Sequence, residues 1–210
     1  MTPEFCLKCF KPGQYLCANC LKNLDFGIKY FCFHCRRRLS PQNLCLPHHQ
    51  KPIKYLISFA EYDQKFFKNL IFLSKYEPHG YHKIIEFFGQ MIKQEINFLL
   101  EKDYYLVPVP MTKRKLLLRG FNQSEILART LNNKKIFLGL KKIKETKPQA
   151  QLNFEERKTN LLGAFLLKEK PPLKLILIDD VITSGETLKI CGETLRAGGA
   201  KEIIALTILF

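Results

Sequence analysis

Residues 175–188 read LILIDDVITSGETL, and this stretch decides the fold. A continuous apolar run ends in two adjacent acids, and a short turn of Thr, Ser and Gly then leads into a helix-like segment. Continuous apolar runs are typical of strands that are buried on both faces of a parallel sheet. In open α/β sheets, ligands bind at the carboxyl ends of such strands. The stretch therefore predicts an α/β fold with a ligand site where this strand ends.

The sequence around this stretch continues the alternation of strands and helices. We expect further strands near residues 53–62, 104–109, 136–143 and 203–209, and helices near 64–75, 79–101, 122–131, 154–162 and 186–197. The long segment 79–101 carries apolar residues at helical spacing, which is typical of a helix that packs on a core. Strands that alternate with helices indicate a mostly parallel sheet.

The turn after the two acids has the chemistry of a phosphate site. It offers hydroxyls and backbone N–H groups at the start of a helix, from Thr183, Ser184, Gly185, Glu186 and Thr187. Helix N-termini favour anions, and glycine lets the backbone approach them closely. Two carboxylates would repel a phosphate unless they face sugar hydroxyls or a Mg²⁺ ion. The whole string favours a phosphorylated sugar over the alternative, in which the turn merely caps a helix.

Composition and charge indicate a globular protein with a polyanionic partner. The 210 residues include 34 Lys and Arg against 19 Asp and Glu, a net charge of +15. A hydrophobic content of 46% excludes a disordered chain. No apolar run approaches the roughly 18 residues of a membrane span, and the N-terminus lacks a signal-peptide core. We therefore expect a cytoplasmic protein.

Seven of the eight cysteines lie in the first 45 residues, where we expect knuckles and turns because helical periodicity is absent. In a reducing compartment, C-x2-C pairs favour metal over disulfides. The first set, spaced C-x2-C-x7-C-x2-C, is Cys6, Cys9, Cys17 and Cys20. The second set, spaced C-x2-C-x9-C-x2-H, is Cys32, Cys35, Cys45 and His48. Since His34 and His49 lie nearby, the last ligand stays open. We expect one or two structural Zn²⁺ ions, because four protein ligands leave no catalytic position.

Basic residues accompany these cysteines. Residues 1–60 carry nine basic and two acidic side chains, a net charge of +7. Arg36, Arg37 and Arg38 form a run beside Tyr30, Phe31 and Phe33. Arginines that pair with phosphates, beside rings that stack on bases, suit single-stranded DNA. In the alternative, the rings form a small core and the arginines are solvated. The remaining cysteine, outside this region, is expected to be a packed core thiol: Cys191.

Three stretches together resemble the ComF competence family. Residues 107–128 read VPVPMTKRKLLLRGFNQSEILA, and residues 151–165 read QLNFEERKTNLLGAF. Residues 175–188 look like the phosphoribosyl-pyrophosphate (PRPP) motif of type I phosphoribosyltransferases, and the cysteine-rich start is similar to the family's zinc-ribbon-like module. The resemblance implies a type I phosphoribosyltransferase fold with a mostly parallel sheet. We expect a zinc-binding module at 1–52 and a phosphoribosyltransferase-like domain at 53–210, in which 53–101 form a cover.

The resemblance also implies roles for individual residues. Asp179 and Asp180 would hold the ribose hydroxyls at the catalytic centre, and the turn at 183–187 would hold the 5′-phosphate. The loop at 110–113 would contact a Mg²⁺-bound diphosphate. The basic residues expected around the diphosphate are Lys113, Arg114, Lys115, Arg119, Arg157 and Lys158. Two alternatives remain: 113–115 are a solvated charge run, and Arg119 and Asn122 fix the loop internally.

Three functional hypotheses follow. The first is a Mg²⁺-dependent phosphoribosyltransferase that displaces pyrophosphate with an unidentified acceptor. The second is a competence protein that handles incoming single-stranded DNA in the cytoplasm and recognises PRPP without turnover. The family's association with natural transformation favours the second. A third, compatible with it, has the zinc module docking a DNA-translocating ATPase of the competence machinery at the inner face of the membrane.

Overall fold

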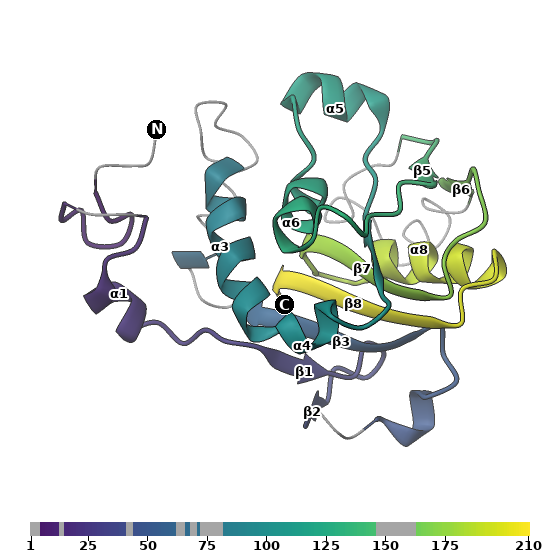
Figure 1. Ribbon diagram of the computed structural model, residues 1–210, viewed down its shortest axis with the longest axis horizontal. Helices are drawn as coiled ribbons and strands as arrows, with labels where there is room; N and C mark the ends of the chain where they lie inside the picture. The colour runs from purple at the N-terminus through teal and green to yellow at the C-terminus, as the bar shows by residue number, and fades with distance from the viewer. Residues whose placement is uncertain are drawn as a thin grey trace.

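The computed structural model describes residues 5–12, 15–40, 44–61, 66–67, 71, 82–145 and 163–210. A six-stranded sheet forms its centre (Figure 1). From edge to edge, the strands are β2 (Arg38–Leu39), β1 (Lys29–Phe31), β3 (Ile53–Ala60), β8 (Glu202–Leu209), β7 (Lys174–Val181) and β4 (Tyr105–Pro108). The last four are parallel to one another, and β1 and β2 are antiparallel to their neighbours. The expected α/β fold with a mostly parallel sheet is confirmed.

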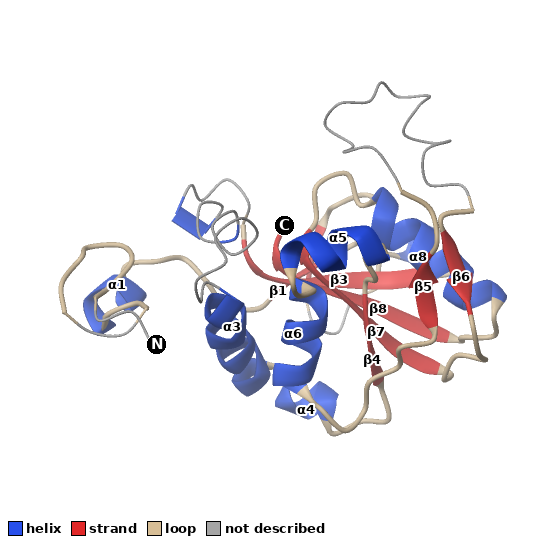
Figure 2. Ribbon diagram, turned by 90° about the horizontal axis from the view of Figure 1, so that it is seen from above, coloured by secondary structure: helices blue, strands red, loops and turns tan. Residues whose placement is uncertain are grey.

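The two faces of the sheet are covered by different helices. Figure 2 shows α3 (His82–Glu95) and α6 (Gln123–Leu131) on one side and α8 (Glu186–Ala197) on the other. Ile176 and Ile178 of β7 belong to the core on the α3–α6 side, whereas Leu175 and Leu177 belong to the core on the α8 side. Because both faces are buried, β7 needs an uninterrupted apolar sequence. Among the described residues, no helix combines the length and apolar character that a membrane crossing requires.

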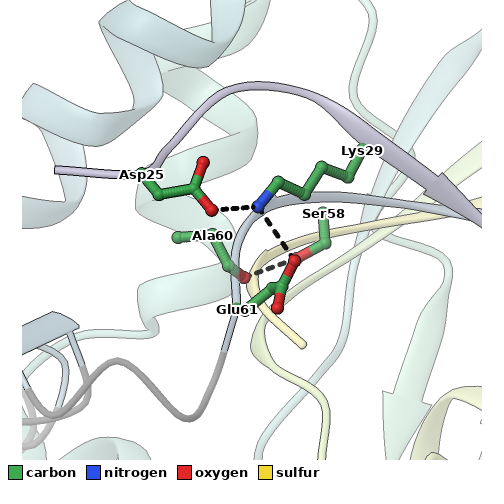
Figure 3. Close-up of polar contacts among 5 residues, drawn as sticks. All are labelled: Asp25, Lys29, Ser58, Ala60 and Glu61. Atoms are coloured by element: carbon green, nitrogen blue, oxygen red, sulfur yellow. Dashed lines mark hydrogen bonds and ion pairs between the residues drawn. The ribbon is translucent and has the colours of Figure 1, made fainter.

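The cysteine-rich segment is joined to the sheet through β1. Tyr30 of β1 pairs with Ile57 of β3, and an ion-pair cluster lies at the same junction. Lys29 Nζ lies 2.9 Å from Asp25 Oδ2 and 2.9 Å from Glu61 Oε1, as Figure 3 shows. Burial opposes the charge on Lys29, but the hydrogen bonds to the two carboxylates raise its pKa. The junction therefore combines strand pairing with a satisfied buried charge.

Several expected elements agree with the structure. The strands near 53–62, 104–109 and 203–209 correspond to β3, β4 and β8, and the helices near 122–131 and 186–197 correspond to α6 and α8. The expected helix 79–101 is interrupted at Ile96, after which a short α4 (Asn97–Leu100) begins. The expected helix 154–162, and most of the one at 64–75, lie outside the described residues.

Other expectations were wrong or incomplete. The cysteine-rich segment is more than knuckles and turns, since it forms α1 (Ala18–Lys22), β1, β2 and a 3-10 turn, η1 (Leu46–His48). No helix was expected in the charged stretch after β4, which forms α5 (Lys113–Arg119). Thr112 Oγ1 caps it by accepting from Lys115 N, and Gly120 ends it with a φ of 82°. The expected extended run at 136–143 is confirmed in part: it contributes an isolated bridge and then β5 (Leu140–Lys142), which pairs with β6 (Phe165–Leu167).

Candidate functional site

The two acids lie at the carboxyl end of β7, where their side chains are held by hydrogen bonds. Asp179 Oδ1 accepts from Ser124 Oγ at 2.9 Å and from the backbone N of Asp180 at 2.9 Å. Asp180 is 6% exposed, and its Oδ1 accepts from the backbone N of Val181 at 2.9 Å. Both carboxylates are thus oriented by the protein alone, which lowers the entropy cost of ordering them around a ligand.

Ser124 is a site residue that sequence reasoning missed. It belongs to α6, whose start is fixed by the motif RGFNQS at 119–124. Asn122 Oδ1 accepts from Ser124 N at 3.1 Å, and Asn122 Nδ2 donates to the Val109 carbonyl at 3.0 Å. Arg119 Nη1 donates to Gln123 Oε1 at 2.9 Å. Arg119 and Asn122 therefore make hydrogen bonds within the protein, as expected if they fix the loop internally. Asn122 bonds both to Val109, just after β4, and to Ser124, which in turn donates to Asp179.

Residues 183–187, which we call the TSGET loop, form the turn between β7 and α8. Gly185 is the N-cap of α8 with a φ of 81°, a conformation that favours glycine. Glu186 is the first residue of α8, and its backbone N donates to Ser184 Oγ at 3.4 Å. A hollow of about 200 Å³ is lined by Asp179, Val181, Ile182, Thr183, Ser184, Gly185, Thr187 and Leu188. The structure thus brings a predicted acid and the loop to one hollow at a helix N-terminus, where anions are favoured.

A second, larger hollow lies beside β4, and it is basic. Its volume is about 750 Å³, and Lys113 and Arg114 of α5 are among the residues that line it. Three further cations line it that were not predicted, Lys141, Lys142 and Lys168. Two acids, Glu125 and Glu145, also line it. Burial, and then the nearby charge of Lys115, lower the pKa of Lys142. The hollow adjoins the acid end of β7, because its Pro108 pairs with Ile178.

The three predicted DNA-binding arginines are placed differently. Arg37 and Arg38 are exposed and line a hollow of about 680 Å³ together with Leu44 and Leu46. Arg36 is only partly exposed, and its Nη2 donates to the Ser184 carbonyl at 2.9 Å. The neighbouring rings of Phe31 and Phe33 are buried, with 8% and 4% exposure, as expected in the alternative in which they form a small core. The predicted Arg157 and Lys158 lie outside the described residues.

Both cysteine sets form tight clusters, in each of which all ligand atoms lie within 4.8 Å of one another. Cys9 Sγ lies 3.7 Å from Cys17 Sγ, and Cys35 Sγ lies 3.7 Å from Cys45 Sγ. A tetrahedral zinc ion with Zn–S bonds of about 2.3 Å separates its thiolates by about 3.8 Å. Both clusters could therefore hold a metal ion such as zinc.

His48 is the fourth potential ligand of the second cluster. Its Nδ1 lies 3.4 Å from Cys32 Sγ and 3.4 Å from Cys45 Sγ. The other two candidates face backbone carbonyls, since His34 Nε2 lies 3.2 Å from the Ile53 oxygen and His49 Nδ1 lies 2.6 Å from the Leu46 oxygen. The second set therefore has the composition that the spacing predicted.

Backbone hydrogen bonds lower the pKa of Cys17 and Cys35 and, against the effect of burial, that of Cys6. Two other thiols of the clusters shift in the opposite direction. Burial, together with contacts to the other three thiols of its set, raises the pKa of Cys20 to about 12. Burial and contacts with Cys32 and Cys35 raise the pKa of Cys45 to about 11. A bound divalent cation supplies the charge that stabilises such thiolates. Cys191, by contrast, is fully buried among apolar side chains of α8, as expected for a core thiol.

The two clusters are built on the same backbone turn. In the first knuckle (residues 6–11), Cys6 N donates to the Lys11 carbonyl at 2.7 Å and Phe10 N to the Cys6 carbonyl at 2.8 Å. In the second knuckle (residues 32–37), the Cys32 N donates to the Arg37 carbonyl at 2.8 Å and Arg36 N to the Cys32 carbonyl at 3.0 Å. Phe10 and Arg36 occupy the same place in the turn, with φ values of 60° and 62°.

Comparison with known proteins finds relatives that are named for competence and for DNA utilization. No protein-family model matches it. It is 26% identical to competence protein F of Haemophilus influenzae over 94% of the chain and 85% of that protein. It is 24% identical to competence protein ComFC of Bacillus subtilis over 95% of the chain and 85% of that protein. Over 47% of the chain and 45% of the relative, it is 34% identical to the DNA utilization protein YhgH of Salmonella typhi. Along most of its length, the chain is thus similar to proteins of the ComF competence family.

Proposed function

We propose that the chain is a competence protein that handles incoming single-stranded DNA in the cytoplasm and binds PRPP with Mg²⁺. The names of its relatives, competence protein F, competence protein ComFC and DNA utilization protein YhgH, support a role in DNA uptake. One observation carries the PRPP assignment: Asp179, held by Ser124, lines the same hollow as the Gly185 turn. Acids for ribose hydroxyls and a helix N-terminus for a phosphate thus lie side by side.

The roles in the proposed complex follow from the two hollows. Asp179 and Asp180 hold the ribose hydroxyls, and the TSGET loop holds the 5′-phosphate. The diphosphate lies in the basic hollow, where five cations face two acids. Mg²⁺ binds with the diphosphate, since hard oxygen ligands suit it. Arg119 and Arg157 remain predicted PRPP contacts.

The DNA surface and the metals complete the proposal. Exposed Arg37 and Arg38 beside apolar side chains suit a single strand, whose phosphates pair with cations. The net charge of +15 supports the same partner. Each cysteine cluster holds one structural Zn²⁺, and a DNA-translocating ATPase is a further partner.

Calorimetric titration of Mg²⁺–PRPP into the full chain tests the pocket. We expect Asp179→Asn and Asp180→Asn each to weaken binding about tenfold or more, since charge-assisted hydrogen bonds contribute about 1.5–3 kcal/mol. Asp103→Asn is the matched control, because Asp103 is an exposed acid that pairs with Lys135. Single-stranded DNA binding should persist in all three variants. Absence of binding by the wild-type chain at saturating ligand contradicts the pocket assignment.

The second candidate function is an active phosphoribosyltransferase. The observation that favours it is the basic hollow of about 750 Å³, which lies within the range of about 300–1,000 Å³ of small-molecule sites. Pyrophosphate release, measured with and without single-stranded DNA and with a panel of bases, distinguishes the two. Catalytic release supports a transferase, whereas tight PRPP binding without release supports recognition alone.

A further inference from the structure

We propose that Arg36 is a positioning residue for the TSGET loop and that it ties phosphate binding to the second knuckle. The inference rests on the proposed PRPP site and adds a residue to it that reaches the loop from the cysteine-rich segment. Arg36 and Ser184 are 148 residues apart in the sequence, and their hydrogen bond connects the two parts of the chain.

The hydrogen bond fixes the orientation of one peptide unit of the loop. Arg36 Nη2 holds the Ser184 carbonyl oxygen at 2.9 Å. In a trans peptide the C=O and the following N–H point in opposite directions. The N–H of Gly185 is therefore directed away from Arg36. A loop that binds phosphate through backbone N–H groups depends on such an orientation.

The guanidinium group itself is held between aromatic rings. Its central carbon lies 4.8 Å from the Phe210 ring centroid and 5.5 Å from the Phe33 ring centroid. A planar guanidinium stacks on rings while it donates in its plane, which a lysine ammonium does not reproduce. Phe210 in turn packs against Phe31, with centroids 4.6 Å apart. Arg36 is thus placed before any ligand binds.

Gly185 and Arg36 are matched in shape. A Cβ atom at Gly185 would lie 2.5 Å from Arg36 Nη2, well inside van der Waals contact. Two features therefore favour glycine at position 185: the φ of 81° and the close approach of Arg36. Because shortening the Arg36 side chain removes the close contact but not the φ, a pair of substitutions can test the contact.

The knuckle determines the backbone at Arg36. A non-glycine residue at a φ of 62° carries strain of about 1–2 kcal/mol. The two backbone hydrogen bonds between Cys32 and residues 36–37 hold this turn closed. The position of the guanidinium at the TSGET loop thus depends on the integrity of the second metal cluster.

The test measures Mg²⁺–PRPP affinity and backbone hydrogen exchange in the full chain. We expect Arg36→Ala to weaken binding about tenfold, Arg36→Lys to restore only part of the loss, and Lys51→Ala, which removes an exposed cation, to change it less than about twofold. Without ligand, exchange in residues 183–187 should be faster in Arg36→Ala and unchanged in Lys51→Ala. Equal affinity and equal exchange in Arg36→Ala and wild type would overturn the inference.

Two controls separate the possible failures. If wild type does not bind PRPP, the proposed function fails, while the exchange comparison still decides whether Arg36 orders the loop. If Arg36→Ala is globally destabilised, a double-mutant cycle with Gly185→Ala decides, using exchange at residues 186–189 as the readout. Gly185→Ala should accelerate exchange less in the Arg36→Ala background, because the close contact is gone. Additive effects would overturn the inference.

Discussion

The two knuckles share a backbone turn and differ in what that turn touches. In the first, Phe10 is 74% exposed, and the contact with α3 comes from beyond the knuckle, through Tyr15, whose ring centroid lies 5.6 Å from that of Phe87. In the second, Arg36 at the equivalent place reaches the TSGET loop. Figure 1 shows the same contrast, with α1 at the margin beyond α3 and β1 beside the central strands. We therefore infer that the first knuckle has a structural role alone, whereas the second is also connected to the proposed PRPP site.

The largest expected effect concerns PRPP affinity, which should fall when the second cluster loses its metal ion but not when the first does. Cys9→Ser and Cys35→Ser each remove an exposed ligand, and each should leave one zinc ion per chain by elemental analysis. We expect Cys35→Ser to weaken Mg²⁺–PRPP binding at least about tenfold, or about 1.4 kcal/mol, because the Arg36 turn opens. Cys9→Ser should change the affinity less than about twofold. Equal effects of the two substitutions would remove the distinction between the knuckles.

A smaller difference is expected for DNA. The double variant Arg37→Ala/Arg38→Ala should weaken single-stranded DNA binding several-fold and reduce the slope of log affinity against log salt by about 1–2, since two phosphate contacts are lost. Lys8→Ala/Lys11→Ala removes two exposed cations from the first knuckle and is the matched control. Fluorescence anisotropy across a salt series measures both. A larger loss in the control pair would assign the DNA surface to the first knuckle.

The smallest expected effect concerns zinc affinity, which depends on the backbone strain at Phe10 and Arg36. Glycine adopts positive φ without the penalty, so Phe10→Gly should keep or tighten zinc binding at the first site, by up to about 1 kcal/mol or fivefold. Arg36→Gly should do the same at the second site and yet weaken PRPP binding. Competition with a chromophoric chelator gives the metal affinities. Loss of zinc from Phe10→Gly would show that the exposed ring contributes to the knuckle.

Local patterns in the sequence were enough to predict the structure at the centre of the molecule. The apolar run of β7, the acids at its end and the turn into α8 were predicted, because each depends on neighbours in the sequence. Both clusters of potential metal ligands were predicted from the spacing of the cysteines for the same reason. The α/β fold followed from the alternation of strands and helices.

The missed features depend on contacts between distant residues. β1 and β2 have three and two residues, too few for a periodic pattern, and β1 exists because it pairs with β3. The helix α5 exposes Leu117 at 85% and Leu118 at 79%, so its sequence lacks the amphipathic spacing of a packed helix. The Ser124–Asp179 and Arg36–Ser184 hydrogen bonds connect residues 55 and 148 positions apart. Such contacts leave no local signal.

Hydrogen exchange of the full chain with and without Mg²⁺–PRPP tests the central claim most directly, because it reports on both knuckles and on the loop together. The account predicts that ligand slows exchange at residues 179–187 and, through Arg36, at the second knuckle, while the first knuckle is unchanged. Protection of the first knuckle, or unchanged exchange at the TSGET loop under saturating ligand, would contradict it.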